Sequence, residues 1–444
     1  MSQTGNPNSH PQAKTQESSS EEDEPVSDVS SFRPKRNIQR GRSLLHFPFD
    51  SLRNRNFARL WISMFFSMGG IQMQMLARGY FVYEITGSAK LLGVVSAGGA
   101  LPVLVLSLVG GVFADRLPRK RVIQVGQATT VFVTFTVAAM ILTDNITWVY
   151  LLIAAMIQGC TWAFMMPARQ AFIPQLVGRD NVGNAIALSA AGMSVTTLVA
   201  PAIGGVLYAA VGPEGVYFVI SGMMVAALAI TSTVTELGET QKKGKSAVLG
   251  DIKEGIIYMM NDRLILTLLG LSMAFVLLAM PINFLMPVLV VDIYNKESQA
   301  FGLLMSMMGV GSLIGSLAVA SLGHWRRGMI VIGGGFLTGI SLLLIAGLPY
   351  YFAGVVIMIV MGLGNAANRA VNQGLVMEHI KDEYRGRVMS VYMMSFGLMP
   401  LGVLPMGIGA DLLGPRPVIA MMAIAMLLVT AGVLVTQKNL RSIH

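Results

Sequence analysis

The sequence predicts an all-α membrane protein with twelve transmembrane helices in two pseudo-symmetric six-helix halves. Its composition is the first reason: 54% of the 444 residues are hydrophobic, only 12% are charged, and the mean hydropathy is +0.63. A soluble globular domain has about a quarter of its residues charged. The second reason is that uncharged apolar runs of about 20 residues, long enough to cross the hydrocarbon core, recur along the chain. The third is a weak internal repeat.

The repeat divides the membrane region into two similar parts. "SAKLLGVV" is echoed by "SQAFGLLM", with Gly93 matching Gly302, and "LVGRDNVGNA" is echoed by "HIKDEYRGRV", with Gly183 matching Gly386. We expect a disordered cytoplasmic tail over 1–50, six-helix bundles over 51–234 and 264–436, a cytoplasmic central loop over 235–263, and a C-terminal tail over 437–444. The tail has no apolar run near Met1, so no signal peptide is expected.

The first six spans follow in order after the polar tail. The second of them includes 24 residues, Leu91–Ala114, without a charge. After the fourth, Arg169, Pro174 and Arg179 predict that the chain leaves the membrane gradually. The six expected spans are Phe57–Tyr83, Ala89–Ala114, Val122–Leu142, Trp148–Ala168, Ile186–Val211 and Val216–Val234.

The second six spans begin after the central loop "TELGETQKKGKSAVLGDIKEG". Each is an apolar run bounded by charged or turn-forming residues. They are expected at Leu264–Val290, Phe301–Leu322, Met329–Leu348, Phe352–Met377, Met389–Ala410 and Pro417–Thr436.

The distribution of lysine and arginine predicts the orientation. With twelve spans and both termini in the cytoplasm, the outward loops contain only Lys90, Lys296 and Arg416, and Arg78 lies near the outer end of the first span, where it is expected to snorkel. The remaining cations lie on or near the inner side. This bias follows the positive-inside rule and predicts a multi-pass protein of the plasma (inner) membrane. The net charge of +9 is thereby explained by topology and lipid headgroups, and no nucleic acid is expected as a partner.

A charged loop between the second and third spans carries the most specific motif. "GVFADRLPRKRVI" resembles the signature loop of the major facilitator superfamily. "SLRNRNFARLW", "GYFVYEITGSAKLLG", "PARQAFIPQLV" and "YRGRVMSVYMM" resemble the branch that contains enterobactin exporters and macrolide efflux proteins, which are drug:proton antiporters. The resemblance covers roughly residues 50–436. It implies a major facilitator fold and alternating access.

The resemblance implies a cytoplasmic gate at the signature loop, made of Gly111, Asp115, Arg116, Arg119 and Lys120. Asp115 is expected to hold the cytoplasmic seam closed by facing the start of span eleven, since a carboxylate near a helix N-terminus is stabilised by up to about 1 kcal/mol. Arg116, Arg119 and Lys120 are expected to pair with inner acids or lipid phosphates. The alternative is that the cluster only sets topology.

Span five carries a second motif, "APAIGG", similar to the Gly-Pro-x-x-Gly-Gly stretch of antiporters. Pro201, Gly204 and Gly205 are expected to kink the helix there. Close packing through small residues is the alternative explanation.

The resemblance also implies that spans one, four, seven and ten line the central cavity. Their polar residues are the candidates for substrate contact, and Arg369 is expected to share one helical face with its three asparagine neighbours. Its two alternative roles are to bind an anionic group of the cargo and to form an ion pair near the inner mouth. The candidates are Gln72, Gln74, Gln158, Asn283, Asn365, Asn368, Arg369 and Asn372. The methionines of these helices suit adaptable binding of amphiphiles, or are ordinary packing and lipid-facing residues.

The energy source is expected to be protons. No P-loop pattern indicates ATP, and no span has an acidic residue at its middle. Either Asp115, Asp292 or Asp411 therefore carries the proton, or the chain is a uniporter. No catalytic set, metal site or cofactor is expected, and the single cysteine, Cys160, forms no internal disulfide. We therefore predict a monomeric, proton-driven exporter of small amphiphilic molecules such as drugs, siderophore-like compounds or other secreted metabolites. The alternatives are an importer or lipid-related carrier of the same fold, and a sensor or scaffold that does not transport.

Overall fold

The structure is a computed structural model of the whole chain. It describes residues 50–178, 181–235, 259–260, 262–322, 326–380 and 397–441 together with Tyr384, Val388, Tyr392 and Ser395. Of residues 50, 107–116 and 438–439 it gives the helical backbone but not the side chains. The expected tail over 1–49, most of the central loop and most of the start of span eleven lie outside the described residues.

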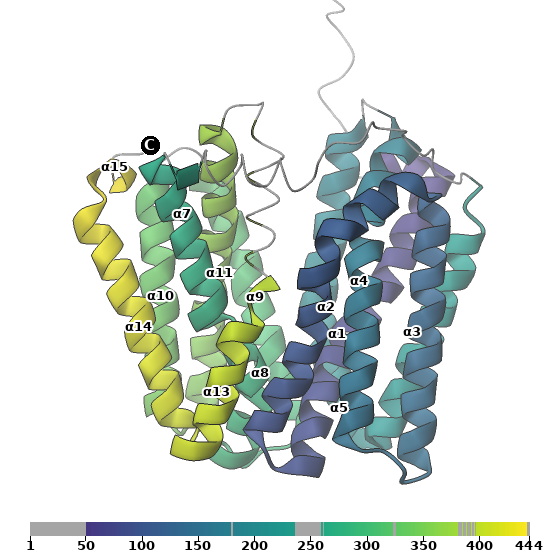
Figure 1. Cartoon of the computed structure of the whole chain (residues 1–444), viewed down its shortest axis with the longest axis horizontal. Helices are drawn as coiled ribbons and strands as arrows, with labels where there is room; N and C mark the ends of the chain where they lie inside the picture. Colours follow the sequence, from purple (N-terminus) through teal and green to yellow (C-terminus); the bar gives the residue numbers. More distant parts are fainter. Residues whose placement is uncertain are drawn as a thin grey trace, which may run out of the picture. The chain divides into compact units, whose positions relative to one another are not determined.

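The first half is built from long helices that run back and forth across the molecule (Figure 1). A short helix, η2 (Asp50–Arg53), precedes the first of them. The helices are α1 (Arg55–Thr86), α2 (Ala89–Arg116), α3 (Arg119–Leu142), α4 (Trp148–Val177) and α5 (Val182–Ser232). We call the end at which the described chain begins and finishes the proximal end, and the opposite end the distal end.

The label α5 covers the fifth and sixth expected spans. Gly212 has φ 73° and ψ 174°, so the helix is interrupted there and the chain reverses without a longer loop. Such a conformation favours glycine, because any other residue is strained at positive φ. The boundary expected between Val211 and Val216 is therefore found at Gly212.

Among the described residues, the second half contains nine labelled elements and the C-terminal α15 (Lys438–Arg441). They are α7 (Arg263–Ala274), η4 (Phe275–Ala279), α8 (Ile282–Val288), η5 (Leu289–Ile293), α9 (Ser298–Leu322), α10 (Arg327–Gly347), α11 (Tyr351–His379), α13 (Pro400–Leu413) and α14 (Pro415–Thr436). The first four together make up span seven, and α13 is the described part of span eleven.

Span seven differs from the single regular helix that the sequence predicts. Its segments η4 and η5 are π-helical, and Pro281 and Pro287 interrupt the hydrogen-bond ladder between them, because proline has no N–H to donate. The Leu277 carbonyl oxygen, one turn before Pro281, lies so close to Gly402 of α13 that a Cβ there would be 2.4 Å away. Span seven is thus irregular where it packs against span eleven.

Span four also differs from the expected course. It was predicted to leave the membrane after Ala168, yet α4 continues without a break to Val177, and Arg169 is 2% exposed. The helix keeps its backbone hydrogen bonds past Arg169, which turns its side chain into the bundle. The helix of span four is therefore longer than the expected span, and Arg169 lies within it.

Nine helices among the described residues are long and apolar enough to cross a membrane. The long α5 provides two crossings, while α1 is long but more polar, and α13 is the described part of a longer span. Together they account for twelve crossings in two halves. Many large apolar side chains, including Phe132, Phe352 and Leu428, are more than two-thirds exposed, as expected for a surface that faces lipid.

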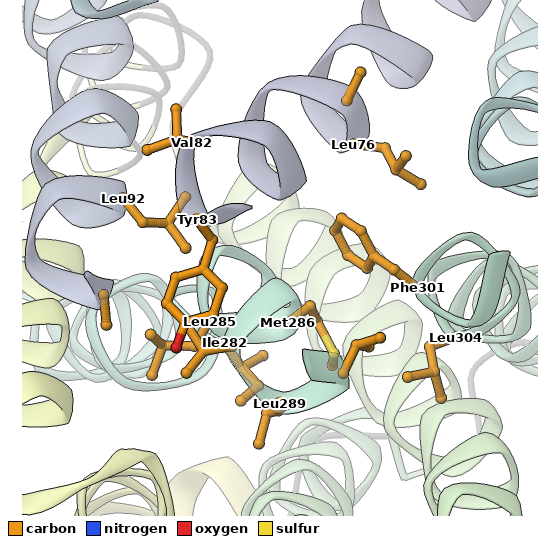
Figure 2. Close-up of a cluster of buried hydrophobic side chains, with 14 of the residues drawn as sticks. Leu76, Val82, Tyr83, Leu92, Ile282, Leu285, Met286, Leu289, Phe301 and Leu304 are labelled. Atoms are coloured by element: carbon orange, nitrogen blue, oxygen red, sulfur yellow. The ribbon is translucent and has the colours of Figure 1, made fainter. Parts of the chain in front are cut away.

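Among the residues that the structure describes, the buried core is continuous between the halves toward the distal end and divided toward the proximal end. One large cluster joins Leu76, Tyr83 and Leu92 of the first half to Met286 and Phe301 of the second (Figure 2). Toward the proximal end the core divides into two separate clusters, one around Phe57, Phe172 and Leu188 and the other around Leu268, Val331 and Leu375. The described residues thus pack the halves together distally and leave each half with its own core proximally.

Candidate functional site

Glycines bring α5 and α9 into contact across the seam between the halves. A Cβ on Gly205 would lie 2.5 Å from the Ser298 carbonyl oxygen, and one on Gly302 would lie 2.5 Å from the Pro201 carbonyl oxygen. Ser298 Oγ donates a hydrogen bond to the Gly205 carbonyl oxygen at 3.1 Å. Nearer the middle, Gly309 approaches the backbone of Leu198 in the same way. The two helices therefore touch through their backbones.

A second crossing joins α2 to α13. A Cβ on Gly93 would lie 3.2 Å from the Val403 carbonyl oxygen, and one on Gly407 would lie 2.6 Å from the Ala89 carbonyl oxygen. Gly93 and Gly302 are the pair that the internal repeat matches. Each therefore lies at the seam, one in each of two pseudo-symmetric crossings.

The "APAIGG" stretch takes part in the first crossing. The dihedral angles of Pro201, Gly204 and Gly205 stay helical, since Gly212 is the one non-helical residue within α5. Gly204 faces Met73 of α1, and Gly205 faces α9. This arrangement corresponds to the small-residue packing that the sequence left open as the alternative to a kink.

Two carboxylates lie at the distal end of the same seam. Tyr83 Oη of α1 donates to Asp292 Oδ2 of η5 at 2.6 Å. Asp411 of α13 accepts hydrogen bonds from Ser88 Oγ at 2.6 Å and from the backbone N–H groups of Ala89 at 2.7 Å and Lys90 at 3.2 Å. Asp411 therefore caps the N-terminus of α2 from the other half. Both side chains are exposed.

A cavity of about 340 Å³ lies in the first half, between α1, α4 and α5. Its walls are mostly apolar and include Trp61, Met64, Met68, Met166 and Ile173. Phe65, Ile186 and Met193 also line it and are 40–53% exposed, so they form its open side. A volume of this size lies within the range of small-molecule sites.

Arg169 is the charged residue of this cavity. Its guanidinium is buried, and Nη2 contacts the sulfur of Met165 at 4.0 Å. Nε and Nη1 have no hydrogen-bond partner among the described residues. Sequence reasoning missed Arg169 because it assigned the residue to the exit of span four. An arginine four residues after Met165 on an otherwise apolar helix was the available signal.

Arg78, Gln158 and Asn283 form a second polar group, located at the seam. Arg78 Nη1 donates to Gln158 Oε1 at 3.1 Å, which links α1 to α4. Arg78 and Asn283 line a small pocket between α1, α2, α8 and α9, in which Asn283 Oδ1 has no partner among the described residues. Arg78 was expected to snorkel outward, and that prediction was wrong, because its side chain bends inward to Gln158.

The polar residues of α11 do not share one environment. Asn372 is fully buried and donates from Nδ2 to the Leu268 carbonyl oxygen at 3.0 Å, and Asn365 accepts from Thr338 Oγ1 at 3.3 Å. Asn368 is 2% exposed, whereas Arg369 is exposed. Their spacing places the four on adjacent turns as expected, but the asparagines pack between helices while Arg369 lies at the edge.

The other two cavity candidates lie on α1. Gln74 is 3% exposed, and Gln72 is half-buried. Neither lines the 340 Å³ cavity, which takes its α1 residues from one to three turns earlier in the chain. The structure therefore separates these two glutamines from the cavity around Arg169.

The signature loop is described only in part. The side chains of Gly111, Asp115 and Arg116 lie outside the described residues, as does most of the start of span eleven. Arg119 Nη1 donates to the Ala171 carbonyl oxygen at 2.7 Å, and Lys120 Nζ donates to the carbonyl oxygens of Ser232 and Val234. These cations were expected to pair with acids or lipid phosphates, but they instead tie α3 to α4 and to the end of α5 within the first half.

The comparison with known proteins agrees with this architecture. The sequence profile of a family of the major facilitator superfamily, described as transmembrane secretion effector, matches residues 47–444. The chain belongs to this family. Macrolide efflux protein A of Streptococcus pyogenes is 26% identical over 76% of this chain and 84% of its own length. The staphyloferrin A transporter of Staphylococcus aureus is 25% identical over 79% of this chain and 88% of its own.

Solved structures show that this chain shares its fold with transporters of low sequence identity. A mutant form of the nucleoside transporter NupG superimposes with a TM-score of 0.75 at 13% identity, covering 86% of this chain and all of that one. A bacterial homologue of the human lysosomal transporter Spinster, in an inward-facing and unoccupied conformation, gives a TM-score of 0.66 at 13% identity, covering 88% and 97%. The protein is thus a multi-pass membrane transporter of the major facilitator fold and not an enzyme.

Proposed function

We propose that this protein exports small amphiphilic molecules by alternating access, driven by protons. The observation that carries the proposal is the division of the core among the described residues: there the halves share one cluster distally and have separate clusters proximally. This is the packing of a transporter that is closed at its distal end. The relatives named as efflux proteins and siderophore transporters support export as the direction.

We place the proximal end in the cytoplasm of a cell bounded by the plasma (inner) membrane. Lys90, Lys296 and Arg416 are the cations at the distal end, while Arg53, Arg119, Lys120 and Arg327 are among those at the proximal end. The positive-inside rule therefore favours proximal loops and both termini in the cytoplasm, so that the structure corresponds to an inward-facing state. Function as a monomer, without nucleic acid, is part of the same proposal.

Substrate contact is proposed for polar residues at or near the seam between the halves. The Arg78, Gln158 and Asn283 group supports this, because each carries a polar atom at or near the seam. Arg369 supports it as an exposed cation of α11. The buried contacts of Asn365, Asn368 and Asn372, and the packing of Pro201, Gly204 and Gly205, also explain these residues as helix-packing positions.

The cytoplasmic gate remains a proposal based on the signature loop. Gly111, Asp115 and Arg116 end α2 at the proximal end, and Arg119 and Lys120 fix the start of α3 to its own half. A gate that closes against span eleven needs such an anchored base. For proton coupling, Asp115, Asp292 and Asp411 are the candidates, and Asp292 and Asp411 also have contacts that join the halves.

Transport by the purified protein in liposomes tests the function. When a proton gradient is imposed across the liposome membrane, a hydrophobic dye should accumulate against its own concentration gradient. Collapse of the proton gradient should abolish the accumulation. Replacing Asp115, Asp292 and Asp411 one at a time with Asn separates proton coupling from dye movement. The variant that lacks the coupling carboxylate should lose gradient-driven transport and still exchange dye across the membrane. Dye movement unaffected by the proton gradient would favour a uniporter, and no movement at all would favour a sensor or scaffold.

A further inference from the structure

We propose that the cavity around Arg169 is a binding site for the anionic group of an amphiphilic molecule whose apolar body lies against the methionines and aromatic residues of α1. The inference rests on the proposed export function and names the class of its cargo. Its starting point is the charge of Arg169, which is buried inside a membrane-spanning bundle without a counter-ion among the described residues.

A lone charge in this position is costly. An arginine within a span costs about 3 kcal/mol on insertion scales, and such residues are normally paired or face water. Arg169 is 2% exposed, forms no ion pair among the described residues, and leaves Nε and Nη1 without acceptors. Three of its five N–H groups need partners that the described chain does not provide, counting one on Nε and two on Nη1. The matching ligand is an anion with two or more acceptor oxygens, such as a carboxylate, sulfonate or phosphate.

The repeat offers a comparison for this position. At the offset of 203 that matches Gly183 to Gly386, Arg169 corresponds to Asn372 of α11. Asn372 is neutral, and its Nδ2 donates to the Leu268 carbonyl oxygen at 3.0 Å. The second half therefore uses this position to join two helices. The first half has a charge there instead, and it has a cavity beside that charge.

The rest of the cavity fits the other end of such a molecule. Trp61, Met64, Met68 and Met166 provide aromatic and flexible apolar surface, and Trp61 is fixed in place because its Nε1 donates to the Leu188 carbonyl oxygen at 3.0 Å. Gln170 and Ser189 are polar residues of the same wall. A cavity with one cationic wall and a largely apolar remainder selects a molecule with one anionic group and an aromatic or aliphatic body.

Two dyes that differ in one group provide the probe. Anilinonaphthalene sulfonate is anionic, and N-phenylnaphthylamine has the same aromatic body without the sulfonate. Binding is measured by fluorescence with the full chain in phosphatidylcholine nanodiscs, with empty nanodiscs subtracted. Arg169→Met keeps a long side chain and removes the charge, so it should weaken binding of the sulfonate at least tenfold and change binding of the neutral dye by less than threefold. Arg169→Lys, without the planar fork, should be intermediate.

Stability distinguishes a binding role from a structural one. Removal of an unpaired buried charge should leave the unfolding temperature of Arg169→Met unchanged or higher. Arg121→Gln removes an exposed cation from the same end of the molecule and should leave the binding of both dyes unchanged. Equal loss of both dyes, or a fall in unfolding temperature, would overturn the proposal. A second arm replaces part of the neutral lipid with phosphatidylglycerol: displacement of the sulfonate identifies a lipid headgroup as the natural anion, and undisturbed binding identifies a soluble cargo.

The outcome is independent of the test of export. If Arg169-dependent binding is found but no dye is transported, the anion site stands and the export function fails. If the neutral dye is exported while sulfonate binding does not depend on Arg169, export stands and the anion site fails.

Discussion

Gly205 of α5 and Gly302 of α9 meet so closely that a Cβ on either would lie 2.5 Å from a backbone carbonyl oxygen of the other helix. Real Cβ atoms do not approach backbone oxygens to that distance, and a backbone cannot move aside as a flexible side chain can. A larger side chain at Gly205 or Gly302 would therefore push the two halves apart.

Gly302→Ala should therefore shift the protein toward a state that is open at its distal end. Spin labels at Asn145 and Tyr350, one in each half and both exposed at that end, report the separation after Cys160 is replaced by serine. We expect a longer or broader distance distribution. Gly222→Ala is the matched control, since a Cβ there meets nothing within 4 Å. An unchanged distribution in Gly302→Ala would show that the crossing does not set the closed state.

Loss of the Asp411 cap should have a smaller effect in the same direction. Asp411→Ala removes the acceptor for the N-terminal N–H groups of α2, and a helix N-cap contributes about 1 kcal/mol. The distal-open population should rise about fivefold. The same label pair measures it, and Glu297→Ala, a charge removed from the distal surface, is the control. If both variants behave alike, a general loss of negative charge explains the effect and the cap does not.

The Tyr83–Asp292 hydrogen bond should couple the two halves directly. Tyr83→Phe leaves the ring in the core and removes only the hydroxyl group, so we expect about 1 kcal/mol less stabilisation of the distal-closed state. A double-mutant cycle with Asp292→Ala isolates the pair: the effects should be less than additive by a similar amount. Tyr150→Phe, at an exposed position, is the control. Full additivity would mean that the hydroxyl and the carboxylate act separately.

Accessibility of single cysteines tests the proposed orientation. With Cys160 replaced, an impermeant thiol reagent added to intact cells should modify cysteines at Asn145 and Tyr350 at the distal end, and should reach one at Thr235 only after the membrane is permeabilised. Modification of Thr235→Cys in intact cells, with the distal positions protected, would place the proximal end outside.

The helices were predictable because their signal is local. Long uncharged runs predict spans from composition alone, and the structure has α1–α4 within a few residues of the expected starts. The boundary between spans five and six was also expected where Gly212 divides α5, whereas the π-helical parts of span seven depend on single proline residues within continuous apolar sequence. The hydropathy pattern alone does not resolve such breaks.

The site was less predictable because it depends on where side chains turn. Arg78 and Arg169 both lie near the ends of apolar runs, where a cation that reaches toward water is the usual arrangement. Their inward direction is set by contacts far away in the sequence, such as that of Arg78 with Gln158. The repeat identified Gly93 and Gly302 as equivalent, but the fact that both lie at the seam required the fold.

The continuous distal core has a thermodynamic consequence for the transport cycle. Opening the distal end exposes apolar surface that includes Leu76, Met286 and Phe301, and exposure of such surface raises the heat capacity. Closing the proximal end cancels this increase in heat capacity only if the two proximal clusters bury an equal apolar area against each other. Any difference makes the equilibrium between the two states curve with temperature. There should then be one temperature at which the distal-closed state is favoured most. The difference between that temperature and the growth temperature sets how readily the cargo can shift the protein from the distal-closed to the distal-open state.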